Sequence, residues 1–196
     1  MAAYTATVRI ENLVHMPFGS LGQALATFAG QNYGAGKMDR IRAAFRQSTA
    51  LMAGIAVALF VFMQLLGSLT VRAFVDDASV IALGRSGLCL TSWFYLFLGM
   101  IYVSRGIQNG VGDAVFAFIN GIIEVTCRIL LPRLLILLPG ADVHVIWWTV
   151  GLTWVFSGAC CLMRYLGWQR RHSNQGGSPF HRHNRKKERF SQHSMA

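Results

Sequence analysis

The sequence predicts an all-α integral membrane protein with five transmembrane helices. Hydrophobic residues make up 54% of the 196 residues and charged residues only 13%, about half the share of roughly 25% that is usual in soluble domains. Asp, Glu, Lys and Arg are absent from four stretches, each near or above the about 20 residues that a helix needs to cross a bilayer. These stretches are residues 12–36, 47–71, 86–104 and 143–163.

The predicted helices follow these four stretches, with one addition. The added helix is an apolar segment that contains Glu124, Arg128 and Arg133, and charges at membrane depth usually face protein or a water-filled cavity. The first helix is the most polar of the uncharged four, so we expect it to pack against protein rather than lipid. The five predicted ranges are 10–32, 48–70, 86–104, 114–138 and 145–166.

Basic residues near the helix ends predict the orientation of the chain, because Lys and Arg accumulate on the cytoplasmic side. The connections after the first and third helices carry Lys37 and Arg105, and the tail after the fifth helix is also basic. The connection after the fourth helix has no Lys or Arg. The sequence therefore predicts a multi-pass protein of the plasma (inner) membrane, with its N-terminus outside and its C-terminus cytoplasmic. An N-terminus on the outside favours an earlier helix upstream.

Residues 169–196 are expected to form a disordered, basic cytoplasmic tail that follows a membrane domain of residues 1–168. The tail is rich in Arg, His, Ser, Gly and Asn, and it supplies much of the net charge of +10. A basic segment beside a membrane more often contacts anionic lipid headgroups than nucleic acid. The lipid bilayer is therefore a predicted partner, and no nucleic-acid partner is expected.

Neither a metal site nor an active site is predicted. A membrane enzyme would need a cluster of Asp, His or Ser on a loop, and the candidates, Asp76 with Asp77 and Asp142 with His144, match no catalytic spacing. We therefore expect no enzymatic activity, no catalytic residues and no cofactor. Four cysteines lie in apolar stretches without a CxxC or Cys–His metal spacing: Cys89, Cys127, Cys160 and Cys161.

A glycine-rich stretch, GQNYGAGK at Gly30–Lys37, ends in lysine as phosphate-binding loops do. A Walker A loop also needs a glycine five residues before its last glycine, and Ser or Thr after the lysine. Those positions hold Gln31 and Met38. We therefore interpret the stretch as a helix exit, where Gly34 and Gly36 permit a tight turn and close helix approach, and Gln31 bonds backbone groups freed at the helix end.

A second stretch, SRGIQNGVGDA at Ser104–Ala114, has similar ingredients. It combines Gln-Asn with spaced glycines at another connection that is predicted to lie inside. The spacing differs from that of the first stretch, so the pattern does not establish a repeat. The residues expected to shape this corner are Arg105, Gly106, Gly112 and Asp113.

These two stretches resemble parts of the multidrug and toxic compound extrusion (MATE) transporters. The segment ALATFAGQNYGAGKMDRIRAAFR is similar to the loop after the eighth helix of that family, and SRGIQNGVGDA to the corner between the tenth and eleventh helices. The resemblance covers residues 5–166 and implies helices 8–12 of a twelve-helix fold. It also implies export of small organic cations or amphipathic compounds in exchange for H⁺ or Na⁺.

The resemblance further implies that the seventh helix and the first lobe are absent from this sequence. Because the substrate cavity lies between two lobes, we expect this fragment to be inactive alone and to need the missing helices or N-terminal lobe as partners. Several branches carry coupling carboxylates in helices seven and ten, but the matching stretch 86–104 has no Asp or Glu. The resemblance is closest to branches with a Glu and an Arg in the eleventh helix, here Glu124 and Arg128.

A polar stripe at intervals of four residues runs along the fourth predicted helix: Asn120, Glu124 and Arg128. Glu placed four residues before Arg favours an ion pair within the helix. Two interpretations remain open. Either the two charges neutralise each other and fix helix packing, or they take part in ion coupling or line a cavity.

Further pathway candidates lie on the first and third helices. His15 and Gln23 fall near one face of the first helix, and a histidine can titrate near neutral pH. Tyr95 belongs to an aromatic stripe of a kind that can hold organic cations. Ordinary packing and hydrogen bonding between helices is the alternative interpretation for all three.

Two other functions stay open at this point. The chain could be a fragment of a related lipid-linked sugar flippase, although such proteins usually carry more cavity arginines. It could also be a non-transporting membrane interaction protein, including a degenerate remnant of a transporter.

Overall fold

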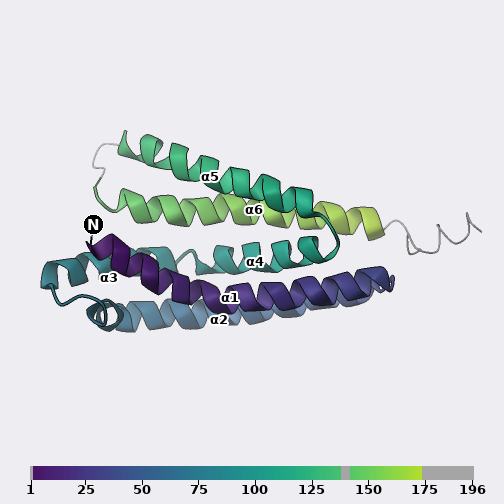
Figure 1. The fold of residues 1–196 in the computed structure, drawn as a ribbon, viewed down its shortest axis with the longest axis horizontal. Coiled ribbons are helices and arrows are strands. Elements are labelled where there is room, and N and C mark those ends of the chain that lie inside the picture. Colours follow the sequence, from purple (N-terminus) through teal and green to yellow (C-terminus); the bar gives the residue numbers. More distant parts are fainter. Residues whose placement is uncertain (1, 138–141, 174–196) are drawn as a thin grey trace, which may run out of the picture.

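The described part of the chain forms six α-helices that run roughly along one axis (Figure 1). The computed structural model describes residues 2–137 and 142–173. Within these residues there is no β-strand, which confirms the predicted all-α class. The helices are α1 (Ala2–Gly34), α2 (Met38–Arg72), α3 (Ala78–Ser92), α4 (Tyr95–Gly110), α5 (Ala114–Ile136) and α6 (Val145–Ser173).

Three of the helices, α2, α5 and α6, are long and apolar enough to cross a membrane, and α3 with α4 forms a bent pair that makes a fourth span if it is counted as one. The predicted count of five is therefore approximate. The difference lies in α1, which has 33 residues but is not among these candidate spans. Its uncharged stretch is the most polar of the four, so α1 differs from the candidate spans in its lower apolar content and not in its length.

The third predicted helix, 86–104, is two helices in the structure. α3 begins earlier, at Ala78, and meets α4 at a bend of 53° after Ser92. The hydroxyl groups of Thr91 and Ser92 donate hydrogen bonds to carbonyls of the preceding turn, at Gly87, Leu88 and Cys89. Such side-chain bonds compete with the backbone ladder and favour a bend, and periodicity alone does not reveal them.

The start of α3 is fixed by Asp77, whose carboxylate accepts hydrogen bonds from the backbone N–H groups of Ser79 and Val80 at 2.8 and 3.2 Å. Together with the Ser79 hydroxyl, these donors lower the pKa of Asp77 below its ordinary value of 3.8. An aspartate at this position satisfies backbone donors that the first turn of a helix leaves open. The cap explains why α3 begins eight residues before the uncharged stretch does.

The connections of the bundle gather at two ends (Figure 1). The α1–α2 corner, the α4–α5 corner and the end of α6 lie at one end, and the N-terminus, the α2–α3 connection and the α5–α6 connection lie at the other. This grouping is the one expected from the sequence, because the basic residues after the first, third and fifth predicted helices belong on one side of a membrane. The predicted tail starts at residue 169, whereas α6 continues to Ser173, and residues 174–196 lie outside the described part of the chain.

Glycines bring α1 and α4 into close contact at the centre of the bundle. A Cβ atom on Gly106 would lie 2.5 Å from the carbonyl oxygen of Gly22, and one on Gly110 would lie 2.3 Å from that of Ala26. Real Cβ atoms do not approach a backbone so closely, so only glycine fits at these two positions. Small residues of this kind are how membrane helices achieve backbone-to-backbone packing.

The two glycine-rich corners have the same backbone geometry. Gly36 and Gly112 both have positive φ, of 72° and 85°. Lys37 N–H donates to the carbonyl of Asn32 at 2.8 Å, and Asp113 N–H donates to that of Gln108 at 2.9 Å. These bonds define the same helix-ending motif with glycine in the left-handed position. The sequence spacing did not establish a repeat, but the local structure repeats.

Candidate functional site

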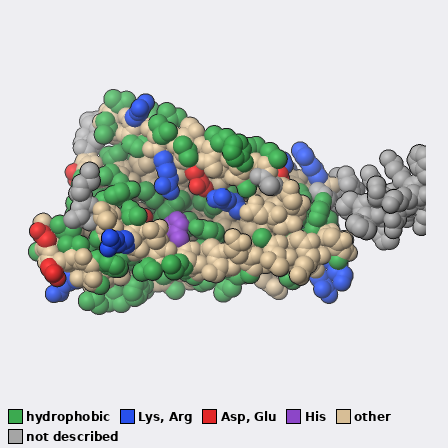
Figure 2. All heavy atoms as spheres, in the orientation of Figure 1, with side chains coloured by type: hydrophobic (Ala, Val, Ile, Leu, Met, Phe, Trp, Pro, Cys, Tyr) green, Lys and Arg blue, Asp and Glu red, His purple; other side chains and the backbone are tan. Residues whose placement is uncertain are grey.

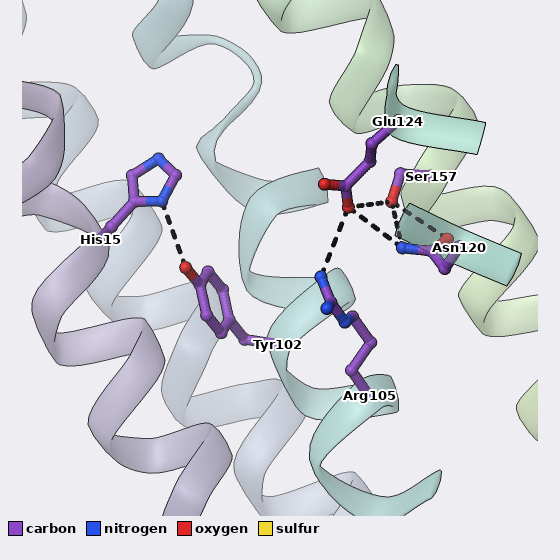
Figure 3. A network of polar contacts seen from close by, with 6 residues as sticks. All are labelled: His15, Tyr102, Arg105, Asn120, Glu124 and Ser157. Carbon is purple, nitrogen blue, oxygen red and sulfur yellow. Dashed lines mark hydrogen bonds and ion pairs between the residues drawn. The ribbon is translucent and has the colours of Figure 1, made fainter. Parts of the chain in front are cut away.

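A carboxylate inside the helical bundle is surrounded by three polar partners from three helices (Figure 3). Glu124 of α5 lies 3.4 Å from the Arg105 guanidinium of α4, measured between Oε1 and Nη1. The same oxygen accepts hydrogen bonds from Asn120 Nδ2 at 3.0 Å and from Ser157 Oγ of α6 at 2.9 Å. These four residues, which we call the Glu124 cluster, tie α4, α5 and α6 together.

The hydrogen bonds of the cluster fix the orientation of the Asn120 amide. A carboxylate only accepts, so this amide must present its NH₂ group to Glu124. Asn120 Nδ2 also donates to Ser157 Oγ at 2.9 Å, and the one proton of that hydroxyl has two acceptors in reach, Glu124 Oε1 at 2.9 Å and Asn120 Oδ1 at 3.2 Å. All three contacts meet at Oε1, and Figure 3 shows Oε2 pointing away from them. Within the described residues, Oε2 therefore remains open to a proton or a cation.

The predicted ion pair between Glu124 and Arg128 is wrong in the structure. The partner of Glu124 is Arg105, from another helix and 19 residues earlier in the sequence. Arg128 is exposed, and no ion pair of the described residues includes it. The physical reason is position. Arg128 lies one turn farther from the α4–α5 corner than Glu124 does, and α5 moves away from α4 as the distance from that corner grows (Figure 1).

His15 lies on α1, facing α4. Its Nδ1 atom is 3.2 Å from the hydroxyl of Tyr102, and its ring packs 5.6 Å from that of Trp154. Tyr102 is on α4 one turn before Arg105, so α4 presents one polar side chain to α1 and the next to α5 (Figure 3). The predicted polar stripes of α1 and α5 therefore meet through α4 rather than directly.

On the face of the molecule shown in Figure 2, many charged side chains lie towards the ends, and a short band of them lies in the middle, between α5 and α1 and beside a histidine. Hydrophobic side chains surround this band. Partial exposure of the cluster agrees with the picture, because the side chain of Arg105 is 35% exposed and that of Glu124 is 26% exposed. The carboxylate is held by neighbours but is not sealed off.

Of the other predicted pathway residues, Gln23 and Tyr95 lie apart from the cluster and Asn120 belongs to it. Gln23 is exposed on α1. Tyr95 is fully buried, and its ring packs 6.2 Å from Trp154, so it belongs to the hydrophobic core rather than to an open aromatic face. Asn120 is buried within the cluster itself.

The corner residues separate into two groups. Gly36, Gly106 and Gly112 have the tight-turn or close-packing roles described above. Gln31 and Gly34 are exposed. The side chain that bonds the backbone here is the neighbouring Asn32, which donates to Phe28 O, one turn earlier within α1, at 2.8 Å.

Asp113 pairs with Arg164 of α6 at 2.8 Å and so links the second corner to the last helix. Sequence reasoning gave Arg105 only a corner role and missed Ser157. A serine in an apolar helix carries no signal of its own, but Arg105, a charge at the edge of an apolar stretch, did call for a partner.

Asp142, His144 and Ser86 form a hydrogen-bonded chain at the end of the bundle that carries the N-terminus. His144 Nδ1 lies 3.0 Å from Asp142, and Nε2 lies 3.0 Å from Ser86 Oγ. The sequence places Asp142 two residues before His144 but does not reveal Ser86, which lies 58 residues away. Ser86 lies within α3 and donates to Leu83 O at 2.8 Å, so its proton bonds the helix backbone. The Val143 N–H and then His144 lower the pKa of Asp142. We interpret the chain as a brace between α3 and the α5–α6 connection.

Comparison with known proteins gives the family. The MatE family model matches residues 1–132. The chain is 24% identical over 112 residues to the probable multidrug resistance protein YpnP of Bacillus subtilis, covering 57% of this chain and 25% of that protein. It is 28% identical over 128 residues to the probable multidrug resistance protein NorM of Pseudomonas putida, covering 63% and 28%.

The chain therefore spans about a quarter of the length of these curated relatives. No solved structure matches it. The family model covers more than half of the chain, including both glycine-rich corners, α4 with Arg105 and most of α5 with Glu124. The chain belongs to the MatE family.

Proposed function

We propose that this chain works as part of a multidrug efflux transporter that exchanges a cationic or amphipathic compound for H⁺ or Na⁺. The observation that carries the proposal is the Glu124 cluster, a partly exposed carboxylate in a membrane helix with one oxygen bonded and the other open. Ionisable residues at membrane depth are costly and mark ion and substrate pathways. The names of the relatives support multidrug resistance as the biological role.

The cluster offers a simple coupling mechanism. When Oε2 of Glu124 binds a proton or a cation, the negative charge that attracts Arg105 is neutralised. The Arg105–Glu124 contact is an ion pair between α4 and α5, so its strength affects the relative position of these two helices. A ligand that binds the two arrangements with different affinity shifts the population between them. Cation binding and helix arrangement are thereby linked through a single ion pair.

Transport needs more of the cavity than these helices form. Secondary transporters move two repeats or bundles against each other around a central site. Since the chain covers about a quarter of its relatives' length, we propose that the remaining helices, including an opposing lobe, act with it. The exposed polar face of α1, with Gln23, is a suitable surface for such helices.

The expected result of Glu124→Gln, introduced into the chromosomal gene, is a loss of at least about tenfold in the initial rate of cationic dye efflux. Glutamine keeps the hydrogen bonds with Asn120 and Ser157 but cannot bind a coupling cation with a full charge. The measurement is fluorescence of ethidium in energised cells at matched protein abundance in the membrane.

Asp76→Asn is the matched control, because it removes a carboxylate from the exposed α2–α3 connection. Its efflux rate is expected to equal that of the wild type. Wild-type efflux in Glu124→Gln cells would end the coupling role of this residue, and unchanged efflux after deletion of the gene would end the transport proposal.

We also propose that the end carrying the two glycine corners faces the cytoplasm of a plasma-membrane protein, with the N-terminus outside. Lys37, Arg40 and Arg42 lie at that end, and basic residues favour the cytoplasmic side. In a variant without native cysteines, Cys at position 76 is expected to react with an impermeant thiol reagent in intact cells, and Cys at position 40 only after lysis. The reverse pattern would invert the topology.

A further inference from the structure

A narrow apolar crevice lies on the side of α4 where α2 and α6 flank it, away from the Glu124 cluster. Its cavity has a volume of about 330 Å³ and is lined almost wholly by apolar side chains, among them Met52, Met100 and Leu162. Gly99 and Gly158 belong to its wall, and their lack of side chains lets Met52 pack closely on Gly99 and Phe97 on Gly158. The crevice is thus an open slot at the depth of the membrane's hydrocarbon.

A second cavity, of about 420 Å³, lies one helical turn nearer the end with the glycine corners. Its polar lining consists of Asp39, Arg42 and Arg46 of α2 and Gln169 of α6, so two guanidinium groups stand against one carboxylate. The stacked rings of Phe45 and Tyr165, with centroids 3.8 Å apart, join the two helices there. The same faces of α2 and α6 line both cavities, so the basic cavity and the apolar crevice follow each other in line.

Between the two cavities lies Thr49, whose hydroxyl is buried and has no hydrogen-bond partner. It lines the apolar crevice at its basic end, three residues after Arg46. A buried polar group without a partner costs free energy, which makes it a position where a ligand acceptor would fit. Arg46 has no ion pair within the described residues, and Arg42 has only the 97% exposed Asp39.

The order of the polar and apolar groups along the two cavities indicates what kind of ligand would fit. Two guanidinium groups come first, then an unpaired hydroxyl donor, then an apolar slot, and Arg46 to Met52 covers about 9 Å along α2. We propose that this crevice binds an anionic phospholipid, with its phosphate on Arg42 and Arg46, an ester carbonyl accepting from Thr49, and an acyl chain beside Met52 and Leu162. Basic pockets between membrane helices are suited to anionic headgroups.

The dimensions and charge argue against other occupants. A helix is about 10 Å across, so a volume of 330 Å³ holds less than one of its turns. A small organic cation is disfavoured by the net positive charge of a lining that carries Arg42 and Arg46 against Asp39 alone. A phospholipid satisfies both the charge and the narrow width.

The test compares phosphatidylglycerol with phosphatidylcholine on the purified full chain in nanodiscs of mixed composition. Lipid retained by the chain after transfer to mild detergent is counted by native mass spectrometry. The wild type is expected to retain one phosphatidylglycerol, and Arg42→Gln with Arg46→Gln to retain it about tenfold less. The matched control removes two exposed arginines at the same end, Arg40→Gln with Arg171→Gln, and should retain the lipid.

Two variants test the apolar slot without altering charge. Ala159→Trp fills the crevice and is expected to remove the lipid, whereas Ala58→Trp, on an exposed part of α2 outside it, is not. Equal retention of both lipids, or retention unaffected by either the arginine pair or Ala159→Trp, would overturn the proposal, as would a second copy of the chain seated in place of lipid. The readout is lipid, not transport, so its failure leaves the Glu124 proposal intact.

Discussion

Gly110→Ala is expected to lower the free energy of unfolding by about 1–3 kcal/mol, the usual cost of overpacking a tight interface. The added methyl group would lie 2.3 Å from Ala26 O, 2.8 Å from Ala29 Cβ and 3.0 Å from Gly30 N. Two of these atoms belong to the backbone of α1, so no side-chain rotation relieves the clash and the helices must separate. Loss of helical circular dichroism during SDS titration in mixed micelles measures the effect.

Gly34→Ala is the matched control, because Gly34 occupies the equivalent place in the other corner and a Cβ there meets no atom within 4 Å. Alanine also has the higher helix propensity, by up to about 1 kcal/mol. The control is therefore expected to be neutral or stabilising. Equal destabilisation by both substitutions would contradict close α1–α4 packing as the cause.

Arg105→Met is expected to destabilise the protein by about 1–2 kcal/mol, because it leaves the Glu124 carboxylate without its counter-charge. Breaking one side of a fully buried ion pair costs more than this, but these side chains are 35% and 26% exposed, so water screens part of the loss. Adding Glu124→Gln to Arg105→Met should recover stability, since no unpaired charge then remains. The same SDS titration gives the free energies of unfolding of the wild type, the two single variants and the double variant, which together form a double-mutant cycle.

The pairing of Glu124 is decided by comparing two arginines. Arg128→Met is expected to change stability by less than about 0.5 kcal/mol and to add independently to Glu124→Gln, as distant sites do. The Arg105 cycle should instead be non-additive by about 1 kcal/mol. A larger coupling of Glu124 with Arg128 than with Arg105 would restore the helical pair that the sequence spacing favours.

The sequence predicts the class and the order of helices well because charge-free length is a direct physical requirement of a bilayer. α5 begins where predicted and ends two residues early, at Ile136. α6 also begins where predicted but continues seven residues further, to Ser173, and α2 begins ten residues before its predicted range, at Met38. The bend after Ser92 was missed because hydroxyl-to-carbonyl bonds decide it, and those depend on rotamers. The shared geometry of the two corners was missed because the Gln-Asn pairs stand at different offsets from their glycines.

The site was predicted in its centre but not in its contacts. Glu124 and Asn120 share a helix and a stripe, so local periodicity identifies them. Arg105 and Ser157 reach Glu124 from other helices, across 19 and 33 residues of sequence. A single sequence contains i, i+4 spacing but no tertiary distance, so it favoured the local partner, Arg128, over the one that the fold brings near.

The bend between α3 and α4 changes how much membrane the chain can cross. Residues 78–110 drawn out as one straight helix would reach about 50 Å at about 1.5 Å per residue, well beyond the about 30 Å of hydrocarbon. With a bend of 53° and α4 along the membrane normal, the reach falls to about 40 Å. The surplus length runs sideways instead, so α3 extends across the end of the bundle, where Gly87 makes room for the Trp147 ring of α6.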